Sequence, residues 1–453
     1  MIKLEKATLK RSLGLWAIVG LGLGYMTPTI VFDTFGIVSN ETNGVVPLAY
    51  LTALVVMLFT AISYGKMVQV FPSAGSAYTY TRETMSPLLG FIVGWAALLD
   101  YILLPMVNAL IIRIYMVSVF PSVPAWIWVV IYVAVVTGLN VWSMGKTSSL
   151  NSILVVFEVV LIAAFIVLAF VKLSHGMGQG TILTTEPLFH SNIHLGAILT
   201  GATVVCFSFI GFDAVTMYAE EAVDQKTLPR AIMLTVFIGG AIFFVCGYFA
   251  QALFPDVSNF KVTDDTLPEI GLYVGGQFFK LVFLAGAFAA TVASGLASHA
   301  SVSRLLFVMG RNGVLPKKLF SYVHPKFRTP AFNVILVGVV SLLAIAPSLE
   351  LISSFINFGA LIAFTFVNLS VIAHFVFRHK KYKTGKDIFS YIIMPILGAG
   401  TTGILWYNLQ ADALIGGLVW VAIGLIYLMF QTRFFRVKIA DFAFDDADKS
   451  SAL

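Results

Sequence analysis

Twelve long apolar segments follow one another along this chain, and they constrain its fold more than any other feature. Each approaches or exceeds the roughly 20 apolar residues that a helix needs to cross a bilayer. Only 11% of the 453 residues are charged, whereas soluble proteins carry about 25%, so lipid must solvate most of the surface. Because backbone groups in lipid must bond within their own segment, each segment should be a helix. The sequence therefore predicts an all-α membrane protein with 12 transmembrane helices.

We interpret residues 1–453 as a single membrane transport domain. Spans 1–5 fall within 13–171, spans 6–10 within 194–377, and spans 11 and 12 within 388–430. The twelve expected spans are 13–38, 46–70, 87–120, 124–142, 151–171, 194–218, 230–254, 276–309, 330–346, 349–377, 388–407 and 413–430.

The distribution of basic residues predicts the orientation of these spans. With the N-terminus inside, 24 of the 28 lysines and arginines fall in cytoplasmic segments, and Arg113, Lys172, Lys261 and Lys280 lie toward the other side. Such an excess is the positive-inside pattern. It accounts for the net charge of +6 without a nucleic-acid partner. We expect a multi-pass protein of the bacterial inner membrane with both termini cytoplasmic, present as a monomer or homodimer.

Two spans contain sequences that should interrupt a helix. Span 1 carries Gly20, Gly22 and Gly24 followed by Pro28, and span 6 carries Gly211 near its middle. Glycine and proline both weaken a helix interior. Interruptions at corresponding positions of two five-span halves are typical of inverted-repeat transporters, in which unwound backbone lines a central site. The alternative is that these glycines only allow helices to pack closely.

Four acids lie within apolar spans, and no lysine or arginine lies deep enough to pair with them: Asp33, Asp100, Glu158 and Asp213. An acid in a membrane span is costly and is by default a candidate for function. An excess of buried acids predicts a cationic ligand, and a diamine would need two acceptors about one four-carbon chain apart.

Each acid has a proposed role and a structural alternative. Asp213, beside the break in span 6, could contact an ammonium group, carry the coupling proton, or cap a half-helix. Asp100 could line the substrate site or form an interhelix hydrogen bond. Asp33 could be a second ammonium acceptor, part of an outer gate, or an exposed acid at the rim. Glu158 could carry the coupling proton, because burial favours its neutral form, or be a protonated packing residue.

The residues around the breaks complete the candidate substrate site. Tyr101 follows Asp100 on span 3, and an aromatic ring can attract an ammonium group through a cation–π contact. Unwound backbone at the breaks can supply further polar contacts. The remaining candidates are Tyr25, Thr27, Phe209, Gly211 and Phe212.

Several motifs resemble those of the amino acid–polyamine–organocation superfamily. Pro72 and the tyrosines of the segment after it are similar to the signature between spans 2 and 3, and Ser76 replaces a glycine of that signature. The other matching segments are Ser208-Phe209-Ile210-Gly211-Phe212-Asp213, Glu220-Glu221, and Met309-Gly310-Arg311-Asn312-Gly313. The resemblance implies a leucine-transporter-like fold of five plus five spans, with spans 11 and 12 outside the repeats.

The segments 31–39, 98–101, 297–304, 322–326 and 356–360 are similar to bacterial putrescine importers. This resemblance implies proton-coupled uptake of a diamine, with the proton as coupling ion and no other cofactor. Amino-acid carriers of the superfamily hold the substrate carboxylate on bare amides at the first break. Here that stretch reads Thr27-Pro28-Thr29, and proline has no N–H, which favours an amine. Sodium-independent amino-acid carriers of the superfamily often have a lysine at the position of Glu158, and this chain departs from that pattern with an acid.

Other functional classes lack their sequence signatures. The chain has no phosphate-binding Gly-x-x-x-x-Gly-Lys motif and no His-Glu-x-x-His metal motif. We therefore expect neither an enzyme nor a metalloprotein. The leading hypothesis is a secondary transporter that imports putrescine or a similar diamine by proton symport with alternating access. The alternative is a proton symporter or exchanger of an amino acid, with a cationic amino acid favoured.

Overall fold

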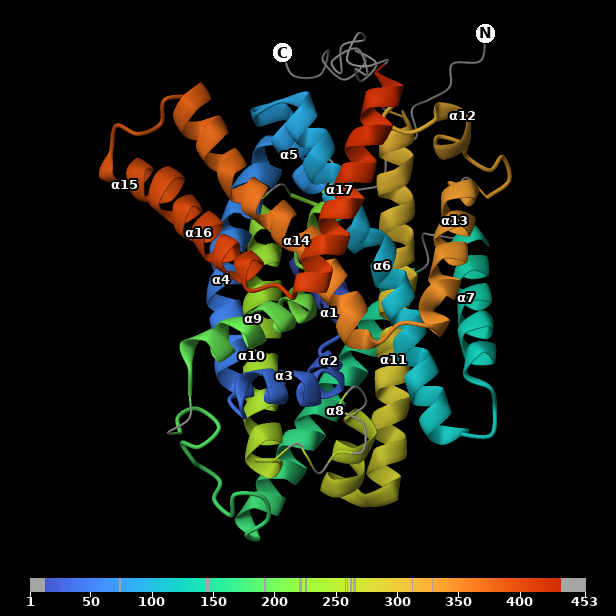
Figure 1. The fold of residues 1–453 in the computed structure, drawn as a ribbon, viewed down its shortest axis with the longest axis vertical. Coiled ribbons are helices and arrows are strands. Elements are labelled where there is room, and N and C mark those ends of the chain that lie inside the picture. The colour runs from blue at the N-terminus through green and yellow to red at the C-terminus, as the bar shows by residue number, and fades with distance from the viewer. Residues whose placement is uncertain are drawn as a thin grey trace.

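The computed structural model describes residues 13–432 except 73–74, 143–146, 191–192, 220–221, 225, 257, 259, 261–262, 264–265, 312 and 328. Among these residues the secondary structure is helical, apart from an isolated bridge between Leu13 and Ala222. The helices run mostly side by side along one direction (Figure 1). An all-helical fold is what the apolar segments predict.

Eleven helical segments of the described chain are long and apolar enough to cross a membrane. The predicted span 330–346 corresponds to a shorter apolar helix, Ala331–Ile345. The structure thus has eleven candidate spans and one short helix where the sequence predicted twelve spans.

The helices of the first half are α1 (Leu15–Met26), α2 (Ile30–Asp33), α3 (Phe35–Thr42), α4 (Val46–Val70), α5 (Ser76–Thr84), α6 (Pro87–Val119), α7 (Ala125–Trp142) and α8 (Thr147–Ser174).

The second half begins with α9 and a short 3-10 turn and ends with the two helices at predicted spans 11 and 12. Its elements are α9 (Leu195–Phe209), η1 (Ala214–Tyr218), α10 (Thr227–Leu253), α11 (Leu267–Arg311), α12 (Lys317–Phe320), α13 (Ala331–Ser341), η3 (Leu342–Ile345), α14 (Leu349–Val371), η4 (Ile372–Arg378), α15 (Gly385–Ile388), η5 (Phe389–Ile393), α16 (Met394–Tyr407) and α17 (Ala411–Gln431).

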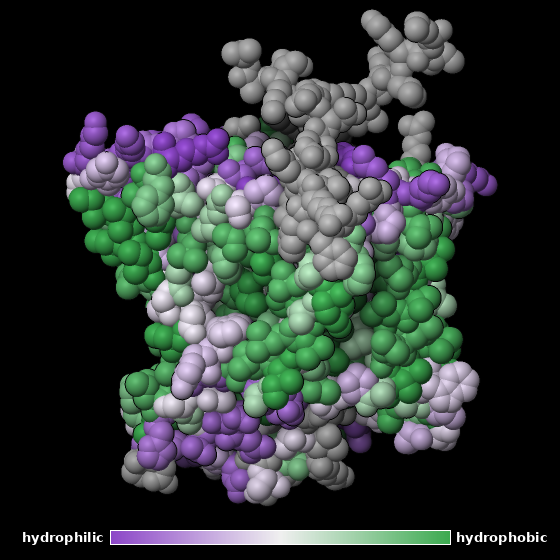
Figure 2. All heavy atoms as spheres, turned by 45° about the horizontal axis from the view of Figure 1, so that its top comes forward, coloured by the Kyte–Doolittle hydropathy of each residue, from purple (hydrophilic) through white to green (hydrophobic). Residues whose placement is uncertain are grey.

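The surface of the molecule carries the pattern expected of a membrane protein. On the face that Figure 2 shows, a hydrophobic belt crosses the bundle, and hydrophilic residues gather at its two ends. Large apolar side chains are exposed on the helices, including Val156 at 64% and Val160 at 58% on α8. Such exposure would be unfavourable in water and is favourable against lipid.

The interrupted spans lie at the centre of the bundle, where side chains surround them on all sides. In the most apolar stretch of span 1, 78% of the residues are buried, and in span 6 the share is 67%. The corresponding share is 22% for each of the last two spans. Figure 1 shows α1 and α2 in the middle of the molecule. The burial pattern therefore makes spans 1 and 6 central and spans 11 and 12 peripheral.

One sequence expectation for span 1 needs correction, because its glycines do not interrupt the helix. Gly20, Gly22 and Gly24 all lie within α1. A Cβ added at Gly22 would lie 2.8 Å from the side chain of Thr235 and 2.9 Å from that of Val215. At Gly22, close helix packing is therefore the correct interpretation. The helix ends only at Met26.

Some residues that carried sequence arguments lie outside the described part of the chain. They include Glu220 and Glu221 and the charged tails, with Lys3, Lys6, Lys10 and Arg11 at one end and Arg433 to Lys449 at the other. The orientation drawn from these charges remains a prediction.

Candidate functional site

The break in span 1 covers the three residues between α1 and α2. Thr27 adopts a left-handed conformation with φ of 49°, and the following residue is Pro28, which disfavours helical backbone in the residue before it. The break leaves carbonyl groups at the end of α1 without helical partners. One of them, on Tyr25, accepts a hydrogen bond from Ser294 Oγ of α11 at 3.1 Å. The unwound backbone is therefore held in place by a neighbouring helix.

The break in span 6 lies against the break in span 1. Between α9 and η1, Gly211 has φ of +128°, a conformation that side chains rarely allow. A Cβ at this position would lie 2.7 Å from Cδ1 of Tyr25 and 3.1 Å from the backbone nitrogen of Met26. Glycine is therefore required both by the backbone conformation and by the close approach of α1.

Asp213 lies at the start of η1 and is held by two hydrogen bonds. Its Oδ2 accepts from the hydroxyl of Tyr101 at 2.9 Å, and its Oδ1 accepts from the amide of Gly211 at 3.2 Å. Its side chain is only 3% exposed. Asp213 makes no side-chain capping bond to η1, so the capping alternative is wrong. The carboxylate is instead fixed between α6 and the break.

Asp100 is a second buried carboxyl group near Asp213. It is 3% exposed on α6, and the two groups are close enough to interact electrostatically. Its Oδ1 has no hydrogen-bond partner in the described structure. A buried acceptor without a partner is costly. The pair therefore offers an open acceptor, and when ionised a negative charge, that a cation could satisfy.

Glu158 on α8 reaches the first break from another direction. Its Oε1 accepts from the backbone nitrogen of Thr29 at 2.7 Å and from the Thr29 hydroxyl at 2.9 Å. Its Oε2 is buried and has no hydrogen-bond partner among the described residues. The amide of Thr29 thus already donates its hydrogen bond to a carboxyl group of the protein itself.

Asp33, at the end of α2, is paired with a tyrosine of α6. Both of its carboxylate oxygens lie 2.9 Å from the hydroxyl of Tyr115. Asp33 is 3% exposed, so the interpretation as an exposed acid at the rim is wrong. Its interpretations as an ammonium acceptor or part of a gate stay open.

Two small cavities lie near the breaks. One is lined by Tyr64, Ser76, Tyr101 and Asp213, and it leaves about 10 Å³ for the centre of a water molecule. The other is lined by Tyr25, Thr27, Asn108 and Ser294, among others, and leaves about 20 Å³. A single water needs about 10–15 Å³ by this measure. Neither cavity can hold a diamine, so this conformation is closed around the site.

The predicted aromatic residues separate into two groups. Tyr101 and Tyr25 line the cavities. Phe209 instead packs against Phe243 with ring centroids 5.3 Å apart, and Phe212 packs against Tyr64 at 5.6 Å. These two phenylalanines line neither cavity. In this conformation they pack against other aromatic rings instead.

Sequence reasoning did not predict that Tyr115 and Thr29 each hold a buried acid. A signal for Tyr115 was present, because Tyr101, Asn108 and Tyr115 are spaced by seven residues and share one helix face. No local pattern pairs Thr29 with Glu158, which lies 129 residues further along the chain.

Comparison with known proteins agrees with the family resemblance of the motifs. A model of the amino acid permease family matches residues 17–440. The low-affinity putrescine importer PlaP of Escherichia coli strain K12 is 49% identical over 439 residues, which cover 97% of each chain. The methylthioribose transporter of Bacillus subtilis strain 168 is 25% identical over 451 residues, 95% of each chain. The vacuolar cationic amino acid transporter 4 of Arabidopsis thaliana is 27% identical over 376 residues, 78% of this chain and 62% of that one.

Proposed function

This chain belongs to the amino acid permease family, and on that premise we propose that it is a secondary transporter that imports putrescine or a similarly small diamine. The observation that carries the proposal is the 49% identity, over 97% of both chains, to a protein named as a low-affinity putrescine importer. Membership of a permease family also supports transport over catalysis.

The chemistry of the buried acids supports a cationic substrate. Asp100, Glu158 and Asp213 form no ion pair with any lysine or arginine that the structure describes. A buried carboxylate without a cation is unfavourable. An ammonium group beside Asp100 and Asp213 would supply the missing charge, and Tyr25, Tyr64 and Tyr101 surround this region.

The contact between Glu158 and Thr29 supports an amine over an amino acid. An amino-acid substrate needs donors for its carboxylate, and the backbone amides of a broken helix can provide them. Pro28 has no amide hydrogen, and the amide of Thr29 is already bonded to Glu158. This part of the first break therefore has little capacity to bind another carboxylate.

We further propose proton symport with alternating access in a five-plus-five inverted repeat. The central, interrupted spans support this arrangement, and so does a closed site that must open to admit substrate. Glu158 is the first candidate for the proton, because it bonds the break directly through one oxygen and has a second without a partner. Asp213 is the other candidate. The charge distribution supports an inner-membrane protein with cytoplasmic termini.

Uptake of labelled putrescine into proteoliposomes tests this function. We expect saturable uptake that is driven by an inward proton gradient and is inhibited by cadaverine. Equal uptake after the gradient is collapsed would remove proton coupling. Strong inhibition by arginine or alanine, without inhibition by cadaverine or spermidine, would overturn the diamine assignment in favour of an amino-acid carrier.

A further inference from the structure

A group of cations and aromatic rings lies at one end of the bundle, remote from the interrupted spans. Phe375 of η4 and Tyr391 of η5 stack with ring centroids 4.4 Å apart. Lys66 Nζ lies 5.2 Å from the centroid of the Tyr391 ring. Lys381 Nζ lies 5.3 Å from that of Phe375 and 5.8 Å from that of Tyr391. We call Lys66, Phe375, Arg378, Lys381 and Tyr391 the basic ring cluster.

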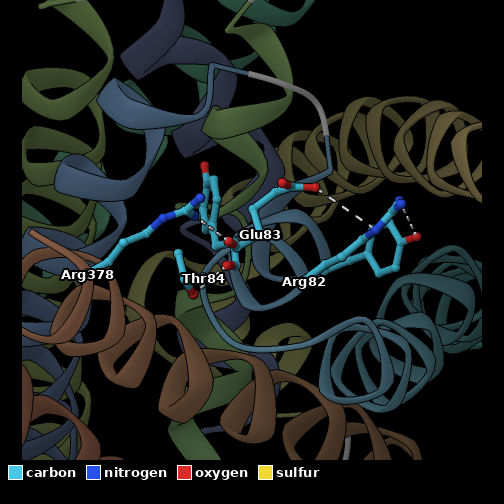
Figure 3. A network of polar contacts seen from close by, with 6 residues as sticks. Arg82, Glu83, Thr84 and Arg378 are labelled. Carbon is cyan, nitrogen blue, oxygen red and sulfur yellow. Dashed lines mark hydrogen bonds and ion pairs between the residues drawn. The ribbon is translucent and has the colours of Figure 1, made fainter. Parts of the chain in front are cut away.

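No acidic side chain of the described residues pairs with the cations of this cluster. Within the described ranges, Lys66, Arg378 and Lys381 form no ion pair. Lys66 donates to the carbonyl of Ser390. Arg378 Nη1 donates to the carbonyl of Glu83 at 3.1 Å, as Figure 3 shows. Carbonyl oxygens leave the positive charges uncompensated, so the cluster can still accept an anion.

The neighbouring acid, Asp387, forms no ion pair with the cluster among the described residues. Asp387 is engaged in a capping box with Thr384 at the start of α15. His374 lies beside His379, with ring centroids 4.5 Å apart. The Nδ1 of His374 is buried without a hydrogen-bond partner. Beyond the cluster, Lys380, Lys383 and Lys386 add charge of the same sign.

Exposed apolar side chains lie on the same two turns as the rings of this cluster. Phe377 is 78% exposed and Phe389 is 55% exposed. Figure 1 shows α15 at one edge of the bundle, and Figure 2 shows a hydrophilic rim directly above the hydrophobic belt. A ligand for this place needs a negative group at the rim and apolar chains below it. Inorganic phosphate has only the first of these features, whereas an anionic phospholipid has both.

We propose that the basic ring cluster binds the phosphate headgroup of an anionic phospholipid from the membrane leaflet on its side. The phosphate lies among Lys66, Arg378 and Lys381, and the acyl chains lie along Phe377 and Phe389. Basic groups between helices at the cytoplasmic boundary provide this kind of recognition. The two turns that carry the rings, η4 and η5, are π-helical, and π-helical turns are frequent at functional sites.

Lipid binding to the purified full chain in detergent tests the proposal. Native mass spectrometry would compare retention of dioleoyl phosphatidylglycerol with that of dioleoyl phosphatidylcholine. The test variant combines Lys66→Gln with Lys381→Gln. The matched control combines Lys317→Gln with Lys318→Gln on α12, which lies at the opposite edge of the same end in Figure 1.

We expect phosphatidylglycerol to bind more tightly than phosphatidylcholine. Each lysine should contribute about a fivefold effect, so the test variant should weaken phosphatidylglycerol binding about 25-fold, and the control should leave it unchanged. Lys381 is exposed, so Lys381→Gln alone should stay folded and weaken binding about fivefold. Equal binding of both lipids, an equal loss in the control, or displacement by millimolar inorganic phosphate would overturn the proposal.

Discussion

Replacing Asp213 by asparagine tests the substrate site most directly. Asparagine has nearly the same shape, and its side-chain oxygen can still accept the hydrogen bond that Tyr101 donates at 2.9 Å. The negative charge is removed, and an NH2 donor replaces Oδ1, which accepts from the amide of Gly211 at 3.2 Å. Because Asp213 is 3% exposed, an ammonium group bound there would be shielded from water. Removing one partner of a buried ion pair costs about 3–5 kcal/mol.

This energy predicts an apparent affinity for putrescine that is about 100- to 4000-fold weaker, at about 1.4 kcal/mol per factor of ten. Binding of labelled putrescine to purified protein would measure the affinity, and uptake into proteoliposomes would measure transport. Tyr101→Phe is the matched control, because it removes the hydrogen bond and keeps the charge. We expect it to weaken binding only about tenfold. Wild-type affinity and uptake in folded Asp213→Asn would refute the assignment of Asp213.

Three further substitutions test the other contacts. Glu158→Gln keeps an acceptor for Thr29 but cannot release a proton. Exchange of putrescine should therefore continue, whereas a proton gradient should no longer accelerate uptake. Uptake that is still accelerated would exclude Glu158 as the proton carrier. Gly211→Ala introduces backbone strain of about 1–3 kcal/mol and a close contact with Tyr25, so it should lower the Tm and abolish uptake. The control is Gly138→Ala, at a position with open space around it, which should change neither. Tyr115→Phe removes the hydroxyl that contacts Asp33 and should lower the free energy of unfolding by about 1.5–3 kcal/mol; an unchanged thermal unfolding curve would contradict that estimate.

The positions of the helices followed from the sequence because hydropathy acts locally. The predicted second span, 46–70, coincides with α4 (Val46–Val70), and the predicted span 276–309 begins at the glycine where α11 is kinked. The two breaks were also predictable, since Pro28 and Gly211 change the backbone at their own positions. The glycines of α1 were misread as helix breakers because their packing partners, such as Thr235, come from a distant helix.

The arrangement of the acids illustrates what a linear pattern omits. All four were identified as functional candidates from their position in apolar spans, although an exposed position at the rim stayed open for Asp33. Their partners were not identified, because Tyr101 and Asp213 are 112 residues apart and Tyr115 and Asp33 are 82 apart. Hydropathy gives the depth of a residue in the membrane but not the direction in which its helix turns it.

The sequence by itself therefore determined a lipid-embedded helical bundle, two interrupted helices and an excess of buried negative charge. Each of these depends on the residue type and its immediate neighbours. Tertiary structure alone decided that Asp100 and Asp213 are close enough to interact electrostatically, and that Glu158 accepts a hydrogen bond from Thr29 in the first break. It also decided that Asp33 accepts a hydrogen bond from Tyr115. The physical reason is that such contacts depend on how each helix is rotated and shifted against the others, which packing of the whole bundle sets.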